Sequence, residues 1–415
     1  MRMTITRLKK RPTLVATALV FFIAQMLSGC DKPQTSPTTT ENNSSPLVVK
    51  IGSAAPLTGP EAHIGKDIEN GIRLAITELN AEHITIGNQV AEFKLLSMDD
   101  MGDPRTATLV AQKLVDSGVS AVIGHFNSGA SIPASKVYND GGIVQITPAS
   151  TAVAYTQQGF PGAMRIITNG NQLGTQMAQY TVQKMGDKQI AIIDDRTAYG
   201  QGVADIFEKA ARQLGASIVK HEFTTDKSSD FNAILTNIKS SDAQVLFFAG
   251  LDIQAAPMIK QMHELGMTIP MIGTEGICTA ELLKLAGAEA NGIICAQPGV
   301  PLVQTQNGLA FQMKFNAQYG PIEMYAPYAY DAMHMLAIAM QKAGSTDPAK
   351  YRPILATLNY SGVTGDIRFD NKGDLANGAT SLYRAENGKW QFIATMKTEK
   401  SADGISAPTN AAPTK

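Results

Sequence analysis

The chain has 415 residues, of which 44% are hydrophobic and 17% charged. This composition excludes a disordered chain or a coiled coil, and the length allows two or three domains with a sizeable core. The formal net charge is −1, but residues 1–29 hold five basic residues and no acidic one. Without them the chain has 30 basic and 36 acidic residues, a net charge of −6. Nucleic acid is therefore not an expected partner, because no basic block offers a phosphate footprint.

The first 29 residues predict a secretory leader. A basic stretch from Arg7 to Arg11 is followed by an apolar run over 13–27 and by small residues before Cys30. The run has 15 residues, shorter than the roughly 20 of a membrane-spanning helix, which disfavours a permanent transmembrane anchor. The sequence Leu27-Ser28-Gly29-Cys30 resembles the bacterial lipobox. This resemblance implies lipidation of Cys30 as the first mature residue, and Asp31 after it implies retention at the periplasmic side of the inner membrane.

Two polar segments flank the expected folded body. Residues 30–46 are dense in Thr, Ser, Pro and Asn, which predicts a flexible tether, and residues 399–415 predict a disordered tail. With Cys30 assigned to lipid, only Cys278 and Cys295 remain. An oxidising envelope favours a disulfide between them, the alternative being two buried free thiols.

The first part of the body alternates short apolar strands with helices. Strands are expected at 47–52, 92–97 and 119–124, the last nearly all apolar, as in a parallel strand covered on both faces. Apolar residues from Ile68 to Leu79 recur with a helical period. Asp103 and Pro104 predict the start of another helix that ends near Asp116.

The same rhythm restarts after Thr168. The expected helices and strands are, in order, helix 169–185, strand 189–194, helix 202–214, strand 217–223, helix 230–239, strand 244–250 and helix 254–265. A long helix at 325–342 precedes strands near 366–370, 381–385 and 389–395. Such alternation predicts doubly wound α/β sheets, and the number of units exceeds one sheet, so we expect two α/β lobes of similar size.

Motifs for catalysis, cofactors and metals are not found in the sequence. Gly200-Gln201-Gly202 opens a helix but lacks the third glycine of a dinucleotide site, which indicates an ordinary turn. His263-Glu264 lacks the second histidine of a zinc protease motif. No phosphate-binding loop and no nucleophile elbow are present. We therefore expect neither an enzyme nor a cofactor.

Polar residues follow several expected strands, at the edge where open α/β sheets bind ligands. Ser128 follows strand 119–124 at the start of a helix, where it either contributes to a carboxylate site or only caps the helix. Residues 147–151 follow a strand at 143–146. Glu275 follows a strand at 270–272, where it either holds an ammonium group or is a solvated turn residue.

Ordered matches along the body identify a family. They include Pro56-Leu57-Thr58-Gly59, Val122-Ile123-Gly124-His125, Ile132-Pro133-Ala134-Ser135, Ala191 to Asp195 with Tyr199-Gly200-Gln201-Gly202, and Gly373-Asp374-Leu375. Together they resemble the substrate-binding proteins of branched-chain, or hydrophobic, amino acid ABC transporters. The resemblance implies a type I periplasmic binding protein fold, with two doubly wound Rossmann-like lobes joined by a three-stranded hinge. Lobe one is expected at 47–168 and 301–372, and lobe two at 169–300 and 373–398.

The resemblance also implies a site for a free amino acid between the lobes. Ser128 and the Thr151 amide would bind the ligand carboxylate. The Ala149 carbonyl, the Thr151 hydroxyl and Glu275 would receive the ammonium group, and Tyr199 would close over the ligand. A zwitterion needs donors at one end and acceptors at the other, in a dry cleft where charge-assisted bonds are strong.

Several positions depart from the family pattern. Ile64 and Leu251 stand where the best-known members have aromatic residues, and the disulfide of those members between the loops near Met101 and Asn127 is absent. Asn127 is still expected at the site. Asp252 is expected either as a second ammonium acceptor or as a solvated helix cap, with the cap favoured. Together Ile64, Phe126 and Leu251 indicate an apolar ligand side chain.

The resulting expectation is a monomeric, lipid-tethered receptor without catalytic activity. It would bind an apolar amino acid of the Leu, Ile or Val type by hinge closure and deliver it to ABC permease subunits in the inner membrane. The alternative on the same fold is a regulatory or scaffold envelope lipoprotein, such as an amide or amino-acid sensor or an activator of a partner enzyme.

Overall fold

The computed structural model describes residues 45–398 and 408–410. The expected leader, the lipidation site at Cys30 and nearly all of the tether lie outside the described residues, as does most of the expected tail. No helix in the described part of the chain is both long and apolar enough to cross a membrane.

A six-stranded sheet forms the first α/β layer, with the strand order β2-β3-β1-β4-β5-β6. Its strands are β1 (Leu47–Ala55), β2 (Thr85–Ile86), β3 (Gln89–Asp99), β4 (Ala121–Gly124), β5 (Val144–Thr147) and β6 (Ala163–Arg165). All pairings are parallel except that of β2 with β3. The carboxyl ends of five strands therefore meet at one edge.

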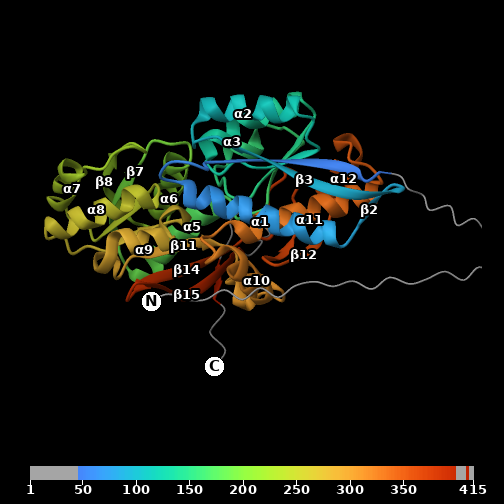
Figure 1. The fold of residues 1–415 in the computed structure, drawn as a ribbon. Helices are drawn as coiled ribbons and strands as arrows, with labels where there is room; N and C mark the ends of the chain where they lie inside the picture. The colour runs from blue at the N-terminus through green and yellow to red at the C-terminus, as the bar shows by residue number, and fades with distance from the viewer. Residues whose placement is uncertain (1–44, 399–407, 411–415) are drawn as a thin grey trace, which may run out of the picture. The chain divides into compact units, whose positions relative to one another are not determined.

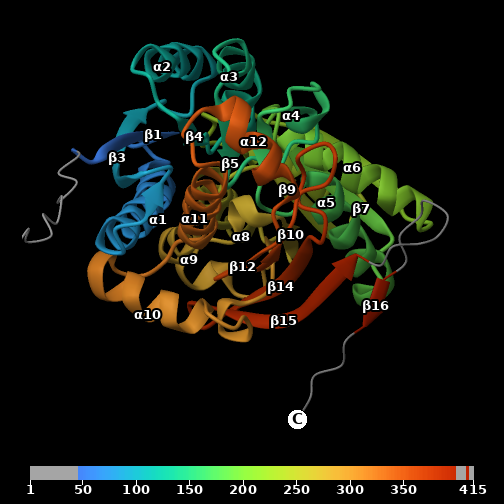
Figure 2. The same cartoon turned by 90° about the vertical axis from the view of Figure 1, so that its right-hand side faces the viewer.

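Helices cover both faces of this sheet, as Figure 1 shows. One face carries α2 (Pro104–Asp116) and α3 (Ser128–Asp140), and the other carries α1 (Ala62–Ala81), α11 (Ala326–Ala343) and α12 (Pro348–Thr357). The side chain of Asp103 accepts hydrogen bonds from the Arg105 and Thr106 amides, with Pro104 next to it. This confirms the predicted start of α2. The helices α1 and α11 lie side by side although they are far apart in sequence (Figure 2).

The second sheet has eight strands in the order β16-β15-β14-β11-β10-β9-β7-β8. Its parallel strands are β7 (Gln189–Asp194), β8 (Ser217–Phe223), β9 (Val245–Ala249), β10 (Met271–Gly273) and β11 (Ile294–Pro298). Its antiparallel strands are β14 (Ala379–Glu386), β15 (Lys389–Thr398) and β16 (Pro408–Asn410). The three residues of β16 fall in the segment expected to be disordered, so the structure differs from that expectation there.

Alternate residues of the central strands point to opposite faces of the sheet and belong to two apolar layers. In β7, Ile190 and Ile192 pack with α5 (Gly170–Gln179) and α6 (Gly200–Gln213). Ala191 and Ile193 belong to the layer on the other face, made by the three helices α7 (Asn232–Lys239), α8 (Asp252–Glu264) and α9 (Ala280–Ala286). Burial on both faces explains why these strands are apolar throughout.

Two elements differ in detail from those predicted from the sequence. The expected helix 169–185 is α-helical only as far as Gln179 and continues as a π-helical segment, Tyr180–Met185. The expected strand near 366–370 is the short β13 (Gly365–Ile367), which pairs only with β12 (Tyr360–Gly362). The other helical segments are α4 (Ala154–Gln157), α10 (Gly308–Tyr319) and three 3-10 turns, Glu275–Ile277, Gly287–Ala290 and Leu302–Gln304.

Candidate functional site

A cavity of about 310 Å³ lies where the carboxyl ends of parallel strands from both sheets converge. This is the edge at which α/β sheets bind ligands. Eight of the ten residues expected at the ligand site line it, and these are Phe126, Asn127, Ser128, Ala149, Thr151, Tyr199, Leu251 and Glu275. The first five follow β4 and β5, whereas the last three follow β7, β9 and β10.

One end of the cavity offers hydrogen-bond donors at the start of α3. Asn127 is the N-cap residue of this helix, and Ser128 is its first residue. The first helical hydrogen bonds are donated by the amides of Ala130 and Ser131 to the Asn127 carbonyl. The Ser128 and Gly129 amides therefore precede the bonded part of the helix, beside the cavity. Such amides, with the helix dipole, suit a carboxylate.

The Ser128 hydroxyl does not cap its own helix. It accepts a hydrogen bond of 3.2 Å from the Ala152 amide, on the loop that follows β5. The side chain is buried, with 2% exposure. Ser128 is therefore not a helix cap and lies in the wall of the cavity, and its role as a carboxylate ligand stays a prediction.

Glu275 provides a buried acceptor. Its side chain is 2% exposed, so it is not a solvated turn residue. Burial raises the pKa of this carboxyl to about 7, although hydrogen bonds, including one from Thr151, work in the opposite direction. The Thr151 hydroxyl donates to Oε1 at 3.0 Å, whereas Oε2 has no hydrogen-bond partner among the described residues. A buried carboxylate with one free oxygen suits an ammonium group.

Tyr199 holds the turn that carries Glu275. Its hydroxyl lies 2.8 Å from Thr274 Oγ1 and accepts a hydrogen bond of 3.1 Å from the Gly276 amide. Burial raises the pKa of the Tyr199 phenol well above its ordinary value, so it is neutral. The ring still lines the cavity, as expected for a residue that covers a ligand.

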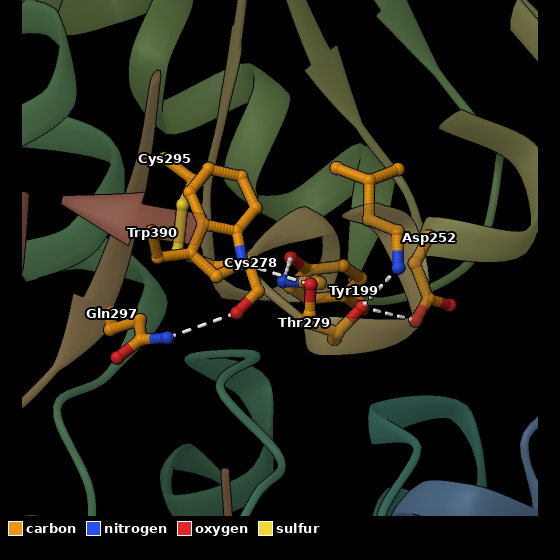
Figure 3. The surroundings of a disulfide bond; sticks show 9 residues. Tyr199, Asp252, Cys278, Thr279, Cys295, Gln297 and Trp390 are labelled. Carbon is orange, nitrogen blue, oxygen red and sulfur yellow. Dashed lines mark hydrogen bonds between the residues drawn. A yellow bond between two sulfur atoms is a disulfide. The ribbon is translucent and has the colours of Figure 1, made fainter. Parts of the chain in front are cut away.

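A disulfide fixes the segment that follows Glu275 in the sequence, and Figure 3 shows the surroundings of this bond. Cys278 and Cys295 are bonded, with their Cα atoms 5.5 Å apart, so the turn is joined to β11. The Cys278 carbonyl accepts a hydrogen bond from Gln297 Nε2 at 2.9 Å. The Thr279 carbonyl accepts one from Trp390 Nε1 at 2.8 Å. These contacts fix the segment that follows the Glu275 turn.

Two expected site residues do not line the cavity. Ile64, on α1, is 3% exposed and packs in the apolar core instead. Asp252 is also buried, and Leu251 rather than Asp252 is the N-cap of α8. The Asp252 Oδ2 atom accepts a hydrogen bond of 2.6 Å from Thr279 and lies 3.1 Å from His63 Nε2. Asp252 is thus neither a solvated cap nor free to bind an ammonium group.

Sequence reasoning missed the charged residues of the cavity other than Glu275. Glu61, Asp195, Arg196 and Asp226 all line it, together with the aromatic Tyr325. Their positions after strand ends were a usable signal in the sequence, the same one that indicates Ser128. Glu61, Asp195 and Asp226 each follow a strand that ends at this edge.

A buried ion pair supports the loop between β5 and α4. Arg165 has 0% exposure and donates from Nη2 to Asp374 Oδ1 at 2.6 Å. Its Nη1 atom donates to the carbonyls of Ser150 and Ala152, at 3.0 and 2.8 Å. The two residues on either side of Thr151 are therefore held by one guanidinium group.

Asp67 supports the cavity wall at Tyr325. Its buried carboxylate accepts hydrogen bonds from four consecutive amides over 323–326, including that of Tyr325 at 2.7 Å.

Among the residues that the structure describes, no three His, Cys, Asp or Glu side chains are grouped to hold a metal ion.

The geometry defines a solute-binding protein of two α/β lobes with a small-molecule cavity between strand ends. A family model described as periplasmic binding protein matches residues 48–389, and the chain belongs to this family. Both the expected family and the expected type I fold are thereby confirmed.

Named relatives agree with this assignment. An amino acid binding protein of Pseudomonas aeruginosa is 36% identical over 79% of this chain and 87% of its own length. A Leu/Ile/Val-binding protein homolog 1 of Brucella suis is 34% identical over 83% and 93%, respectively. Among solved structures, the branched-chain amino acid transporter substrate binding protein LivJ of Streptococcus pneumoniae, in complex with isoleucine, has a TM-score of 0.78. It is 25% identical and covers 84% of this chain and 99% of its own.

Proposed function

We propose that this protein is an exported receptor that binds a free α-amino acid in the cavity and delivers it to an ABC permease. One observation carries the proposal: donors at Ser128 and an acceptor at Glu275 line the same cavity from different sheets. A zwitterion requires this arrangement, with its carboxylate at the amides of α3 and its ammonium group at Glu275. The Ala149 carbonyl and the Thr151 hydroxyl complete the ammonium site.

The side chain of the ligand is proposed to have an aliphatic stem. Phe126, Leu251 and Tyr325 give the cavity apolar surface, so a stem of the Leu, Ile or Val type buries its methylene groups against them. The names of the relatives support this proposal, since they include Leu/Ile/Val-binding proteins.

Binding is proposed to favour a closed arrangement of the two lobes. The expected lobes, 47–168 with 301–372 and 169–300 with 373–398, each supply one half of the zwitterion site. A ligand that contacts both halves stabilises the closed state by the contacts that it makes only there. The permease then distinguishes loaded from empty receptor. No bond is made or broken, so the protein is proposed not to be an enzyme.

Family membership supports a location outside the cytoplasm. The lipid anchor at Cys30, retention at the inner membrane and a monomeric state are proposed from the sequence alone. A free Oε2 atom on buried Glu275 supports a ligand receptor over a scaffold protein, because a protein that binds only partners has no need for an unpartnered buried carboxylate.

Isothermal titration calorimetry of the purified protein with each free amino acid tests the proposal. At least one α-amino acid is expected to bind, and its N-acetyl derivative and its amide are expected not to. Both derivatives keep the side chain but remove one charge of the zwitterion. Absence of binding by every amino acid, or equal binding of the blocked derivatives, would overturn the proposal.

A further inference from the structure

The cavity carries more negative charge than a zwitterion site needs. Besides Glu275, the carboxylates of Glu61, Asp195 and Asp226 line it. They come from three places in the fold: Glu61 precedes α1, Asp195 follows β7, and Asp226 follows β8. We refer to Glu61, Asp195 and Asp226 as the acidic subsite.

Asp195 is the member of this group whose hydrogen bonding is incomplete. Its side chain is 2% exposed. The Oδ1 atom accepts hydrogen bonds from the amide and the hydroxyl of Thr197, at 2.9 and 2.7 Å. The Oδ2 atom has no hydrogen-bond partner among the described residues. A buried carboxylate oxygen without a partner is costly, so a donor from the ligand is the natural complement.

Burial raises the pKa of two carboxyl groups of the acidic subsite. Burial raises the pKa of Glu61 to about 7, against the hydrogen bond of 2.7 Å that Asn127 Nδ2 donates to it. Burial likewise raises the pKa of Asp195 to about 6. The negative charge of Asp226 contributes to both increases. A nearby positive charge would therefore favour the ionised form of both carboxyl groups.

The protein itself supplies little of that charge. Among the lining residues, Arg196 is the one cation, against four carboxylates. Its side chain is exposed, and its guanidinium lies 3.4 Å from the centroid of the Phe223 ring. The described residues also contain no group suited to a metal ion, which points to an organic cation rather than an inorganic one.

We propose that the acidic subsite binds a cationic group at the end of the ligand's side chain, so that the ligand is a basic α-amino acid. This inference rests on the proposed function, in which Ser128 and Glu275 bind the two ends of the zwitterion. The aliphatic stem of the ligand lies against Phe126 and Leu251, and the terminal ammonium or guanidinium group is the donor that Asp195 Oδ2 lacks. An aliphatic ligand would offer no donor to Asp195 Oδ2, the oxygen that no described residue bonds.

The decisive comparison is between ligands that share a stem. Lysine and norleucine have the same carbon chain and differ by the terminal amine, and ornithine and arginine vary the position and shape of the cation. By calorimetry at pH 7.5 and low salt, at least one basic amino acid should bind about 100-fold or more tightly than norleucine, because a site built for a polar group rejects the analogue that lacks it.

Variants connect this preference to the subsite. Asp195→Asn and Asp226→Asn should each weaken binding of the basic amino acid by about 10-fold or more and leave norleucine binding nearly unchanged. Asp226 is exposed, so its replacement tests the subsite even if Asp195→Asn fails to fold. The matched control is Asp242→Asn, which removes an exposed carboxylate that does not line the cavity.

The other outcomes separate the two proposals. Norleucine or leucine binding as tightly as every basic amino acid would overturn the acidic subsite and leave the amino-acid receptor intact. The same holds if neutral citrulline or glutamine binds with the same affinity as the basic amino acids, since the subsite would then recognise hydrogen-bond donors and not a positive charge. If no amino acid of either kind binds, both proposals fail.

Discussion

Thr151 donates a hydrogen bond of 3.0 Å from its hydroxyl to Glu275 Oε1, across 124 positions of sequence. Thr151 follows β5 of the six-stranded sheet, and Glu275 follows β10 of the eight-stranded one. The bond therefore joins the two halves of the cavity at the proposed ammonium site. A ligand ammonium group bound there would contact both Thr151 and Glu275, and so would add to the connection between the two halves of the cavity.

Glu275→Gln is expected to weaken amino-acid binding by at least about 10-fold. The amide keeps the shape of the side chain but removes the charge, and a hydrogen bond to a charged group contributes about 1.5–3 kcal/mol. Calorimetric titration of the variant checks this. Glu289→Gln, at an exposed position, is the control and should bind like the unmodified protein. Unchanged affinity in Glu275→Gln would remove this residue from the site.

Amino-acid affinity is expected to rise with pH up to about 7. Burial raises the pKa of Glu275 to about 7 in the ligand-free protein. The ammonium group binds the ionised carboxylate, so Glu275 must lose its proton before the ligand binds. Below the pKa, affinity therefore falls by up to about tenfold for each unit by which the pH is lowered. Titrations at several pH values between 5 and 8, in one buffer system, measure the slope. A pH-independent affinity would contradict the assigned role.

The same shift has the opposite effect on the stability of the ligand-free protein. Because the folded-state pKa of Glu275 lies above its ordinary value of 4.5, the folded state binds more protons between these pH values. The contribution of Glu275 to stability is therefore lost as pH rises from about 4.5 to 7. Glu275→Gln should reduce this decline in urea unfolding experiments. An identical pH dependence in both proteins would argue against a raised pKa.

Arg165→Ala is expected to destabilise the protein by about 3–5 kcal/mol, because it leaves buried Asp374 without its cation. The variant also releases the carbonyls of Ser150 and Ala152, so amino-acid affinity should fall as well. Urea unfolding measures the stability. Arg212→Ala, which removes an exposed pair with Glu208, serves as the comparison and should cost less than about 1 kcal/mol. Equal effects of the two variants would refute the assignment.

Removal of the disulfide by Cys278→Ser with Cys295→Ser should lower stability by about 3 kcal/mol, since the bond closes a loop over a sequence separation of 17. Affinity should decrease too, because the turn of Glu275 loses its link to β11. Thermal unfolding and titration of the double variant check both effects. Adding reductant to the double variant should change nothing, and a response there would show that the effect has another origin.

Much of the site was predictable from the sequence because of one property of parallel sheets. Their strands all end at the same edge, so polar residues that follow separate strands are brought together without knowledge of the packing. Ser128, Thr151 and Glu275 were found in this way and line one cavity. The family followed from ordered motifs over most of the chain, and the family model confirms it.

Side-chain environments at helix starts were less predictable. Ile64 and Asp252 are close in sequence to residues that line the cavity, but the rotation of α1 and α8 about their axes decides which way their side chains point. That rotation is set by contacts with segments far away in sequence, such as the core around Ile64 and the bonds of Asp252 to His63 and Thr279. Local periodicity contains no information about these contacts.

The sequence by itself thus determined the alternating α/β architecture and the strand ends that carry polar residues, and export by its basic leader stays a prediction from the sequence. Only the tertiary structure decided that Glu61, Asp195 and Asp226 share the cavity with Glu275. The physical reason is that their encounter depends on how the two sheets are placed against each other. Burial of Asp195 and Glu275 then leaves one oxygen of each carboxylate without a hydrogen-bond partner among the described residues.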